Sequence, residues 1–238
     1  LNGNADFMGD DIHYASNHDF VGIEFSIHGM LDGRVRVGMP GKFNADNALA
    51  ALAVCTLALS GGSGVLDDHT KQAILGSLVK VRVDGRMEIA HVSKTCSVIV
   101  DYAHNAVSME SLLTTLRDYH PKRLVCVFGC GGNRARDRRY SMGEIGGKMA
   151  DLCIITADNP RFEKNEDIIK DIEVGLAKTD GTYLVIPDRR EAIFYAIRNA
   201  EEGDMIAIIG KGHEDYQEIE GVKHHFLDRE VVEEAVKG

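Results

Sequence analysis

The sequence after residue 84 repeats one unit several times: a short apolar run, a glycine-containing polar loop, and a segment with helical character. The apolar runs lie at Ser97–Val100, Leu124–Phe128, Leu152–Thr156, Tyr183–Ile186 and Met205–Ile209. Several of them, such as Val98–Val100 and Ile206–Ile209, do not alternate with polar residues, as expected for strands covered on both faces. The repeat predicts an α/β fold: a Rossmann-like, doubly wound, mostly parallel sheet. Helices are expected to begin near Asn105, Ser141, Glu166, Arg189 and Asp228.

The first part of the chain has a different rhythm. Two alternating segments, Val21–Ile27 and Gly33–Gly38, flank a glycine-containing turn and predict a pair of adjacent strands. The run Asn47–Leu59 is rich in Ala and Leu and apolar almost all round, which predicts a buried helix ending at Ser60-Gly-Gly. A second helix is expected after Asp67-Asp68. The change of rhythm predicts a domain over residues 1–83 and another over 84–238.

Composition excludes several classes of protein. Lys and Arg total 27 against 37 Asp and Glu, so the net charge of -10 argues against a broad nucleic-acid-binding face. No apolar run approaches the roughly 18 residues that a membrane-spanning helix needs. The 5 cysteines include no C-x-x-C pair, which favours reduced thiols in a cytoplasmic protein over a disulfide framework or a zinc site.

Polar residues follow almost every predicted strand of the second part. These segments are Asp101–His104, Gly129–Arg134, Asp158–Arg161, Asp188–Arg190 and Gly210–Asp215. Because the carboxyl ends of parallel strands meet at one edge of a sheet, where such folds bind ligands, we expect these segments to gather there.

Each segment alone also has a purely structural explanation. The Asn-Pro pair in Asp158–Arg161 stiffens the loop and suits Arg161 to a bidentate grip on a carboxylate, whereas helix capping with an exposed arginine is the alternative. Lys211 offers a point charge and Glu214 an acceptor for an ammonium, or both belong to a flexible charged turn. Asp101 and His104 have neither a nucleophile motif nor a second ligand cluster nearby, so no metal site and no catalytic residue is predicted.

Six motifs, taken in order, resemble those of the Mur ligases, and within them the branch that adds the third residue of the peptidoglycan stem peptide. The motifs are Asn44–Ala51, Gly85–Glu88, Val100–His104, Phe128–Arg134, Asp158–Arg161 and Gly210–Gln217. The likeness covers essentially the whole chain.

The resemblance implies an ATP-dependent amide ligase that uses Mg²⁺ and joins an amino acid to UDP-MurNAc-L-Ala-D-Glu through an acyl phosphate. Its partners would be small molecules, with no nucleic acid and no membrane. By the same resemblance, the contacts to ATP would be Asn44, Asn47, Arg86, Asp101 and His104. The contacts to the incoming amino acid would be Arg139, Asp158, Asn159, Arg161, Gly210, Lys211 and Glu214.

Meso-diaminopimelate is the amino acid favoured by this set. It differs from lysine by a carboxylate at its far end, for which Asn159 and Arg161 supply donors, and Glu214 can accept from the ammonium beside it. A lysine-adding or other paralogous Mur-type ligase stays an alternative. A non-catalytic module that binds an amino acid or a nucleotide is another.

The sequence departs from the family pattern in three places. Ala106 and Tyr140 stand where the family commonly has proline. The phosphate-binding motif G-x-x-x-x-G-K-[ST] is missing, because the Gly-Lys pairs at 41, 147 and 210 lack its spacing and its Ser or Thr. The resemblance therefore implies the tail of a central ATPase domain over 1–83 and a complete amino-acid-binding domain over 84–238, which alone should not catalyse ligation.

Overall fold

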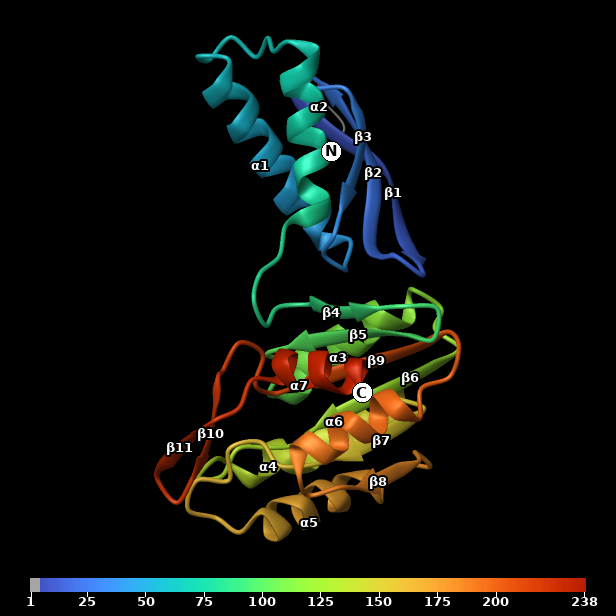
Figure 1. Cartoon of the computed structure of the whole chain (residues 1–238), viewed down its shortest axis with the longest axis vertical. Helices are drawn as coiled ribbons and strands as arrows, with labels where there is room; N and C mark the ends of the chain where they lie inside the picture. The colour runs from blue at the N-terminus through green and yellow to red at the C-terminus, as the bar shows by residue number, and fades with distance from the viewer. Residues whose placement is uncertain (1–4) are drawn as a thin grey trace. The chain divides into compact units, whose positions relative to one another are not determined.

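The computed structural model describes residues 5–238, so the first four residues of the predicted 1–83 domain lie outside the described part. The chain divides into two compact units, one ending at Arg82 and the other covering Val83–Gly238 (Figure 1). The division falls one residue before the boundary that the change of rhythm predicts. Each unit has its own hydrophobic core and is described separately.

The first unit contains a three-stranded antiparallel sheet and two helices. Its elements are β1 (Phe7–Asn17), β2 (Phe20–Gly29), β3 (Gly33–Val37), α1 (Phe43–Leu59) and α2 (Asp68–Ser77), followed by a short 3₁₀ turn at Leu78–Lys80. The predicted neighbouring strands are present as β2 and β3, with Phe25 opposite Val35. Alternate residues of these strands face inward and pack with Leu52 of α1, which gives the unit its core.

The predicted helix over Asn47–Leu59 is present within α1 and ends before Ser60-Gly-Gly as predicted, but the prediction that it is buried is wrong. The helix begins at Phe43, and only one of its faces is buried, through residues such as Ala48 and Leu52. On the outer face, Val54 is 68% exposed and Leu59 is 63% exposed, because nothing in the described part of this unit covers them. Strand β1 was not predicted at all, since its polar sequence lacks apolar alternation and its pairing with β2 runs through the backbone.

The second unit contains a six-stranded sheet. Its strands are β4 (Glu88–Val92), β5 (Cys96–Asp101), β6 (Arg123–Phe128), β7 (Leu152–Ile155), β8 (Tyr183–Val185) and β9 (Asp204–Ile209). They lie in the order β4-β5-β9-β6-β7-β8, with β4 antiparallel to β5 and the other pairs parallel. The predicted mostly parallel α/β sheet is therefore confirmed. A separate hairpin, β10 (Tyr216–Ile219) with β11 (Val222–His225), follows β9.

Helices cover both faces of this sheet. They are α3 (Ala106–Arg117), α4 (Arg136–Met149), α5 (Asn165–Leu176), α6 (Arg189–Arg198) and α7 (Asp228–Lys237). Residues of α6 and α7, including Ile193 and Val232, pack on one face against Val98 and Ile206. On the other face, Gly146 of α4 lets the helix approach closely, so that α3 and α4 pack on the sheet and α5 packs against α4.

Two details of the second unit differ from the sequence prediction. Helix α4 begins at Arg136 rather than near Ser141, because its charged first turn carries no apolar periodicity and its N-cap, Ala135, has no capping side chain. The strands β4, β10 and β11 were not predicted, since each is short and only partly buried or exposed. Ala106, in the place of the usual proline, still opens α3, where a capping box between Asn105 and Ser108 sets the start.

Four of the five cysteines are buried, and all five are free thiols. Burial raises the pKa of Cys130 and of Cys153 to about 12, so these two thiols stay protonated at neutral pH. We predict that Ellman's reagent titrates only Cys55 rapidly in the native chain and all five thiols in denaturant. A second thiol that reacts as fast as Cys55 would show that the core is more open than described.

No helix of the described residues is long and apolar enough to cross a membrane.

Candidate functional site

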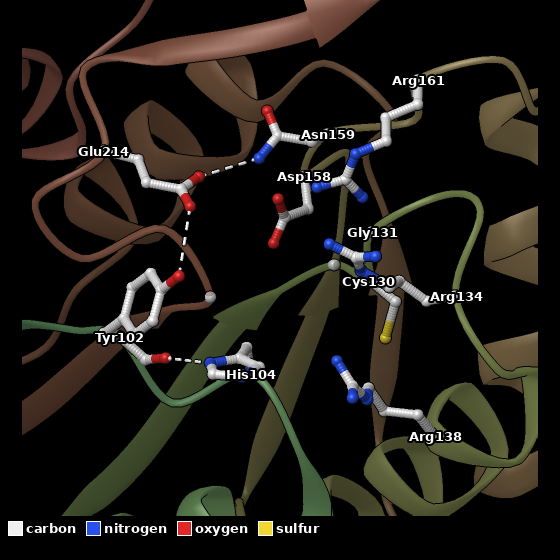
Figure 2. Close-up of a pocket in the computed structure, with 12 residues that line it drawn as sticks. Tyr102, His104, Cys130, Gly131, Arg134, Arg138, Asp158, Asn159, Arg161 and Glu214 are labelled. Atoms are coloured by element: carbon white, nitrogen blue, oxygen red, sulfur yellow. Dashed lines mark hydrogen bonds between the residues drawn. The ribbon is translucent and has the colours of Figure 1, made fainter.

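A cavity lies at the carboxyl edge of the parallel strands in the second unit. Strands β5, β9, β6 and β7 are neighbours there, and the loops that follow them converge (Figure 2). The cavity has a volume of about 330 Å³, the size of a site for a small molecule. Its lining residues are Tyr102, His104, Gly129, Cys130, Gly131, Arg134, Arg138, Asp158, Asn159, Arg161, Gly210 and Glu214. The segment Asp188–Arg190, which follows the edge strand β8, does not line it.

Glu214 is fixed in this cavity from two sides. The Asn159 amide donates to Oε2 of Glu214 at 2.8 Å, and the Tyr102 hydroxyl donates to Oε1 at 3.3 Å (Figure 2). These two donors come from the loops after β7 and β5, whereas Glu214 lies after β9. The carboxylate is therefore held in place before any ligand arrives, and its remaining lone pairs can accept from a cation.

Arg161 lines the same cavity but is already partly engaged. Its Nη1 donates to the Gly132 carbonyl at 2.7 Å, and its Nε lies 3.3 Å from Oε2 of Glu218. Its backbone takes the left-handed conformation, with φ of 53°, which the bridge to Ile219 in the hairpin helps to hold. Of the guanidinium, Nη2 has no partner among the described residues, so Arg161 offers a ligand only part of the fork that the sequence predicts.

Asn159 is similarly shared between the fold and the cavity. Its Oδ1 accepts from the backbone N–H of Glu218 at 2.9 Å, while one of its two amide hydrogens goes to Glu214. One N–H therefore stays available to a ligand. Asn159 and Arg161 lie on one loop, so their free donors and the Glu214 carboxylate face the same space (Figure 2).

Two glycines make the cavity possible. A Cβ at Gly132 would overlap the carbonyl oxygen of Pro160, so only glycine lets the loops after β6 and β7 approach this closely. Gly210 has φ of 113°, and a Cβ there would lie 2.7 Å from Oδ2 of Asp158, inside the cavity. A side chain at position 210 would therefore clash with Asp158 and intrude into the cavity.

Two of the predicted ligand contacts are buried charges beside the cavity. Burial raises the pKa of Asp158, an effect that the nearby charges of Arg189 and Lys211 oppose. Lys211 is fully buried, and its ammonium donates to the carbonyl of Tyr216. Burial lowers the pKa of Lys211. Asp158 lines the cavity, whereas Lys211 does not.

Arg139 does not line the cavity. Its side chain is 1% exposed and forms a bidentate ion pair with Glu163 at 2.8 and 2.9 Å and a further pair with Asp171 at 3.0 Å. Arg134 and Arg138 line the cavity instead, and neither guanidinium has a partner among the described residues. The sequence analysis expected the segment that ends at Arg134 at this edge but assigned Arg134 to no ligand, and it did not single out Arg138 because it started α4 five residues late. With the start at Arg136, adjacent residues 138 and 139 point in different directions.

The predicted ATP contacts fall into both units. In the second unit, both carboxylate oxygens of Asp101 accept from backbone N–H groups, of Met87 and of Ala103, at 2.7 Å. Burial raises the pKa of Asp101, and the hydrogen bonds from these two donors oppose that rise.

The other two predicted ATP contacts of the second unit are Arg86 and His104. Arg86 is exposed, with its guanidinium 4.9 Å from the centre of the Tyr102 ring. His104 lines the cavity, with Nδ1 2.9 Å from the Tyr102 carbonyl. Nδ1 must donate to that carbonyl, so Nε2 of the neutral ring is an acceptor.

The two remaining predicted ATP contacts, Asn44 and Asn47, lie on α1 of the first unit. Asn44 is buried and donates to the Pro40 carbonyl at 2.7 Å, and Asn47 donates to Asn44 at 3.0 Å. In residues 5–238, no group of three or more His, Cys, Asp or Glu side chains is arranged to hold a metal ion.

Comparison with known proteins gives relatives for the whole chain. The chain is 42% identical over 232 residues to a curated protein of Clostridioides difficile named UDP-N-acetylmuramoyl-L-alanyl-D-glutamate--2,6-diaminopimelate ligase, covering 98% of this chain and 46% of the relative. It is also 42% identical to the protein of that name from Aquifex aeolicus, covering 100% of this chain and 45% of the relative. The chain thus spans about half the length of the curated relatives it matches.

A solved structure and a family model agree with these relatives. A structure described as UDP-N-acetylmuramoyl-L-alanyl-D-glutamate--2,6-diaminopimelate ligase superposes with a TM-score of 0.75 at 34% identity, covering 100% of this chain and 46% of that chain. The family model described as "Mur ligase, glutamate ligase domain" matches residues 85–212, from the turn before β4 to the loop after β9. This match covers more than half of the chain, and it includes the loops after β5, β6 and β7 and the start of the loop after β9, as far as Gly212. The chain therefore belongs to the Mur ligase family.

Proposed function

We propose that this chain is the amino-acid-binding part of an ATP-dependent ligase that joins meso-diaminopimelate to UDP-MurNAc-L-Ala-D-Glu. The names of the relatives that are 42% identical to it support this reaction. Because the chain spans about half of those relatives, the proposal concerns the gene product that carries this sequence. We propose that the amino acid binds in the cavity at the sheet edge of the second unit.

The observation that carries the proposal is the meeting of Asn159, Arg161 and Glu214 in one cavity. Diaminopimelate carries a carboxylate and an ammonium on the same distal carbon. The free donors of Asn159 and Arg161 suit that carboxylate, and the fixed carboxylate of Glu214 suits that ammonium. The site therefore places a positive and a negative charge side by side, and the distal end of diaminopimelate carries the complementary pair. Lysine has the distal ammonium but no distal carboxylate, so it matches only one of the two charges.

Arg134 and Arg138 add two unpaired positive charges to the same cavity. We assign Arg134 to the distal carboxylate together with Arg161, because a Cβ at Gly131 would touch both side chains. Figure 2 shows Arg138 and His104 at the opposite side of the cavity from Asn159. There Arg138 is suited to an anionic group near the reacting carbon.

ATP transfers its terminal phosphoryl group to the terminal carboxylate of the dipeptide, which gives an acyl phosphate and ADP. The amine of diaminopimelate then attacks the carbonyl carbon of the acyl phosphate and displaces inorganic phosphate, which leaves the amide. Arg86, exposed and stacked on Tyr102, is the predicted nucleotide contact of the second unit that is free to reach a ligand. Asp101 shapes the loop that carries Tyr102 and His104 through its two backbone acceptor bonds. No residue of the described part is assigned to Mg²⁺, since none forms a suitable cluster.

The test is a ligase assay on the gene product. We expect phosphate release that requires ATP, UDP-MurNAc-L-Ala-D-Glu and an amino acid together, with meso-diaminopimelate preferred to lysine by at least about 100-fold in kcat/KM. A preference for lysine would support the lysine-adding alternative. Tight binding of diaminopimelate with no turnover under any of these conditions would support the non-catalytic module.

A further inference from the structure

Tyr102 lines the cavity but is not assigned to a ligand in the function proposed above. It follows Asp101 at the end of β5, and its hydroxyl donates to Oε1 of Glu214. Asn159 donates to the other oxygen of the same carboxylate. Each oxygen of Glu214 therefore has one protein donor, and the two donors come from different loops. The orientation of the carboxylate depends on both.

The ring of Tyr102 is held on several sides. The rings of His104 and His213 lie with their centres 4.9 and 5.5 Å away, and the Arg86 guanidinium lies 4.9 Å from its centre. A Cβ at Gly212 would lie 2.8 Å from the Cβ of Tyr102, so the loop after β9 packs directly on it. Such packing leaves the ring one orientation, with its hydroxyl directed at Glu214 (Figure 2).

An internal cation competes for Glu214. The ammonium of Lys211 lies 3.6 Å from Oε2, too far for a hydrogen bond but close enough to attract the carboxylate. Glu214 is partly exposed, so without a second anchor its side chain can turn toward Lys211. Burial and the adjacent Glu214 carboxylate raise the pKa of Tyr102, so the hydroxyl remains a proton donor at neutral pH.

We propose that Tyr102 is a positioning residue for ammonium recognition: its hydroxyl holds the Glu214 carboxylate where it accepts from the distal ammonium of the incoming amino acid. This inference rests on the proposed function of the cavity. Tyr102 itself does not touch the reacting atoms in this arrangement. Its contribution is confined to ligands that carry a distal ammonium, which separates it from a general structural role.

The test compares two substrates in the gene product with Tyr102→Phe, which removes only the hydroxyl and keeps the packed ring. One substrate is meso-diaminopimelate, and the other is 2-aminopimelate, which has the reacting amine and the distal carboxylate but no distal ammonium. We expect KM for diaminopimelate to rise about 10-fold with kcat within about twofold, the loss expected for one hydrogen bond to a charged group. KM for 2-aminopimelate should not change. The control is Tyr195→Phe on α6, outside the cavity, which should alter neither.

A Glu214→Gln variant separates failure of this inference from failure of the proposed function. If Glu214→Gln raises KM for diaminopimelate alone and Tyr102→Phe does not, the inference is overturned and the proposed function stands. If Tyr102→Phe raises KM for both substrates equally, the residue is merely structural and the inference is again overturned. If neither variant changes the ratio of the two KM values, the assignment of Glu214 to the ammonium fails as well.

Discussion

Replacing Arg161 by alanine should lower kcat/KM for meso-diaminopimelate about 10- to 100-fold, the range expected when one or two hydrogen bonds to a charged group are lost. The value for lysine should stay within about threefold, because lysine has no distal carboxylate to lose that partner. The ratio of the two kcat/KM values therefore falls mainly because the value for diaminopimelate falls. The measurement is steady-state phosphate release with each amino acid as the varied substrate.

Arg136→Ala is the matched control for this variant. Arg136 is also an arginine near the cavity, but its side chain is 64% exposed, pairs with Asp171 and does not line the cavity. The Arg136→Ala variant should leave kcat/KM for both amino acids unchanged. Since Arg161 also contacts Gly132 and Glu218, the lysine value of Arg161→Ala serves as the internal check on folding. An unchanged ratio of the two kcat/KM values would exclude Arg161 from recognition of the distal carboxylate.

Replacing Asp228 by alanine should destabilise the second unit by about 3–5 kcal/mol. Asp228 and Arg189 are both fully buried and form a bidentate pair at 2.7 Å. Arg189 also donates to the carbonyls of Ala157, in the loop after β7, and of Ile209, the last residue of β9. Without Asp228, the guanidinium is left as a buried charge that two carbonyls compensate only partly. Urea unfolding followed by circular dichroism, with hydrogen exchange of the β9 amides, measures the loss.

Glu234→Ala provides the comparison on the same helix. Glu234 pairs with Arg190, so each variant removes one carboxylate of α7 from one arginine of α6. Both side chains of the Glu234–Arg190 pair are about half exposed, and such pairs contribute about 0–1 kcal/mol. Equal effects of the two variants would show that the Arg189–Asp228 pair does not hold the strand ends together.

Much of the second unit could be predicted because most of its strands are short apolar runs, each followed by a polar loop. Val98–Val100 and Ile206–Ile209 are buried on both faces, and their lack of alternation reports that burial directly. The elements that were missed give no such signal. Strand β4 is only partly buried, and the first turn of α4 is a run of charged residues whose helical start depends on tertiary packing.

The site was predicted at the level of its loops better than at the level of its side chains. Parallel strands bring their carboxyl ends together, so the convergence of Asp158–Arg161 with Gly210–Glu214 follows from topology. Which arginine faces the cavity depends on where α4 starts, and Arg139 proved to be paired inside the unit. Sequence cannot show that Glu163 and Asp171, distant along the chain, already occupy a guanidinium.

Nor does the sequence reveal how donors are divided between fold and ligand. Arg161 donates to the neighbouring loop, and Asn159 accepts from the hairpin, so part of the hydrogen-bonding capacity of each side chain is used within the fold. That sharing makes the side chains rigid, which favours selective recognition, but it limits how many donors each offers. Arg134, which has no partner in the described part of the chain, provides the additional positive charge at that end of the cavity.

A crystal structure of the gene product grown with meso-diaminopimelate examines the whole assignment at once. We predict that the distal carboxylate lies within about 3 Å of donors on Asn159 and Arg161, and that the distal ammonium lies within about 3 Å of the Glu214 carboxylate. Diaminopimelate bound with that end beside His104 and Arg138, or outside the loops that follow β5, β6, β7 and β9, would contradict it.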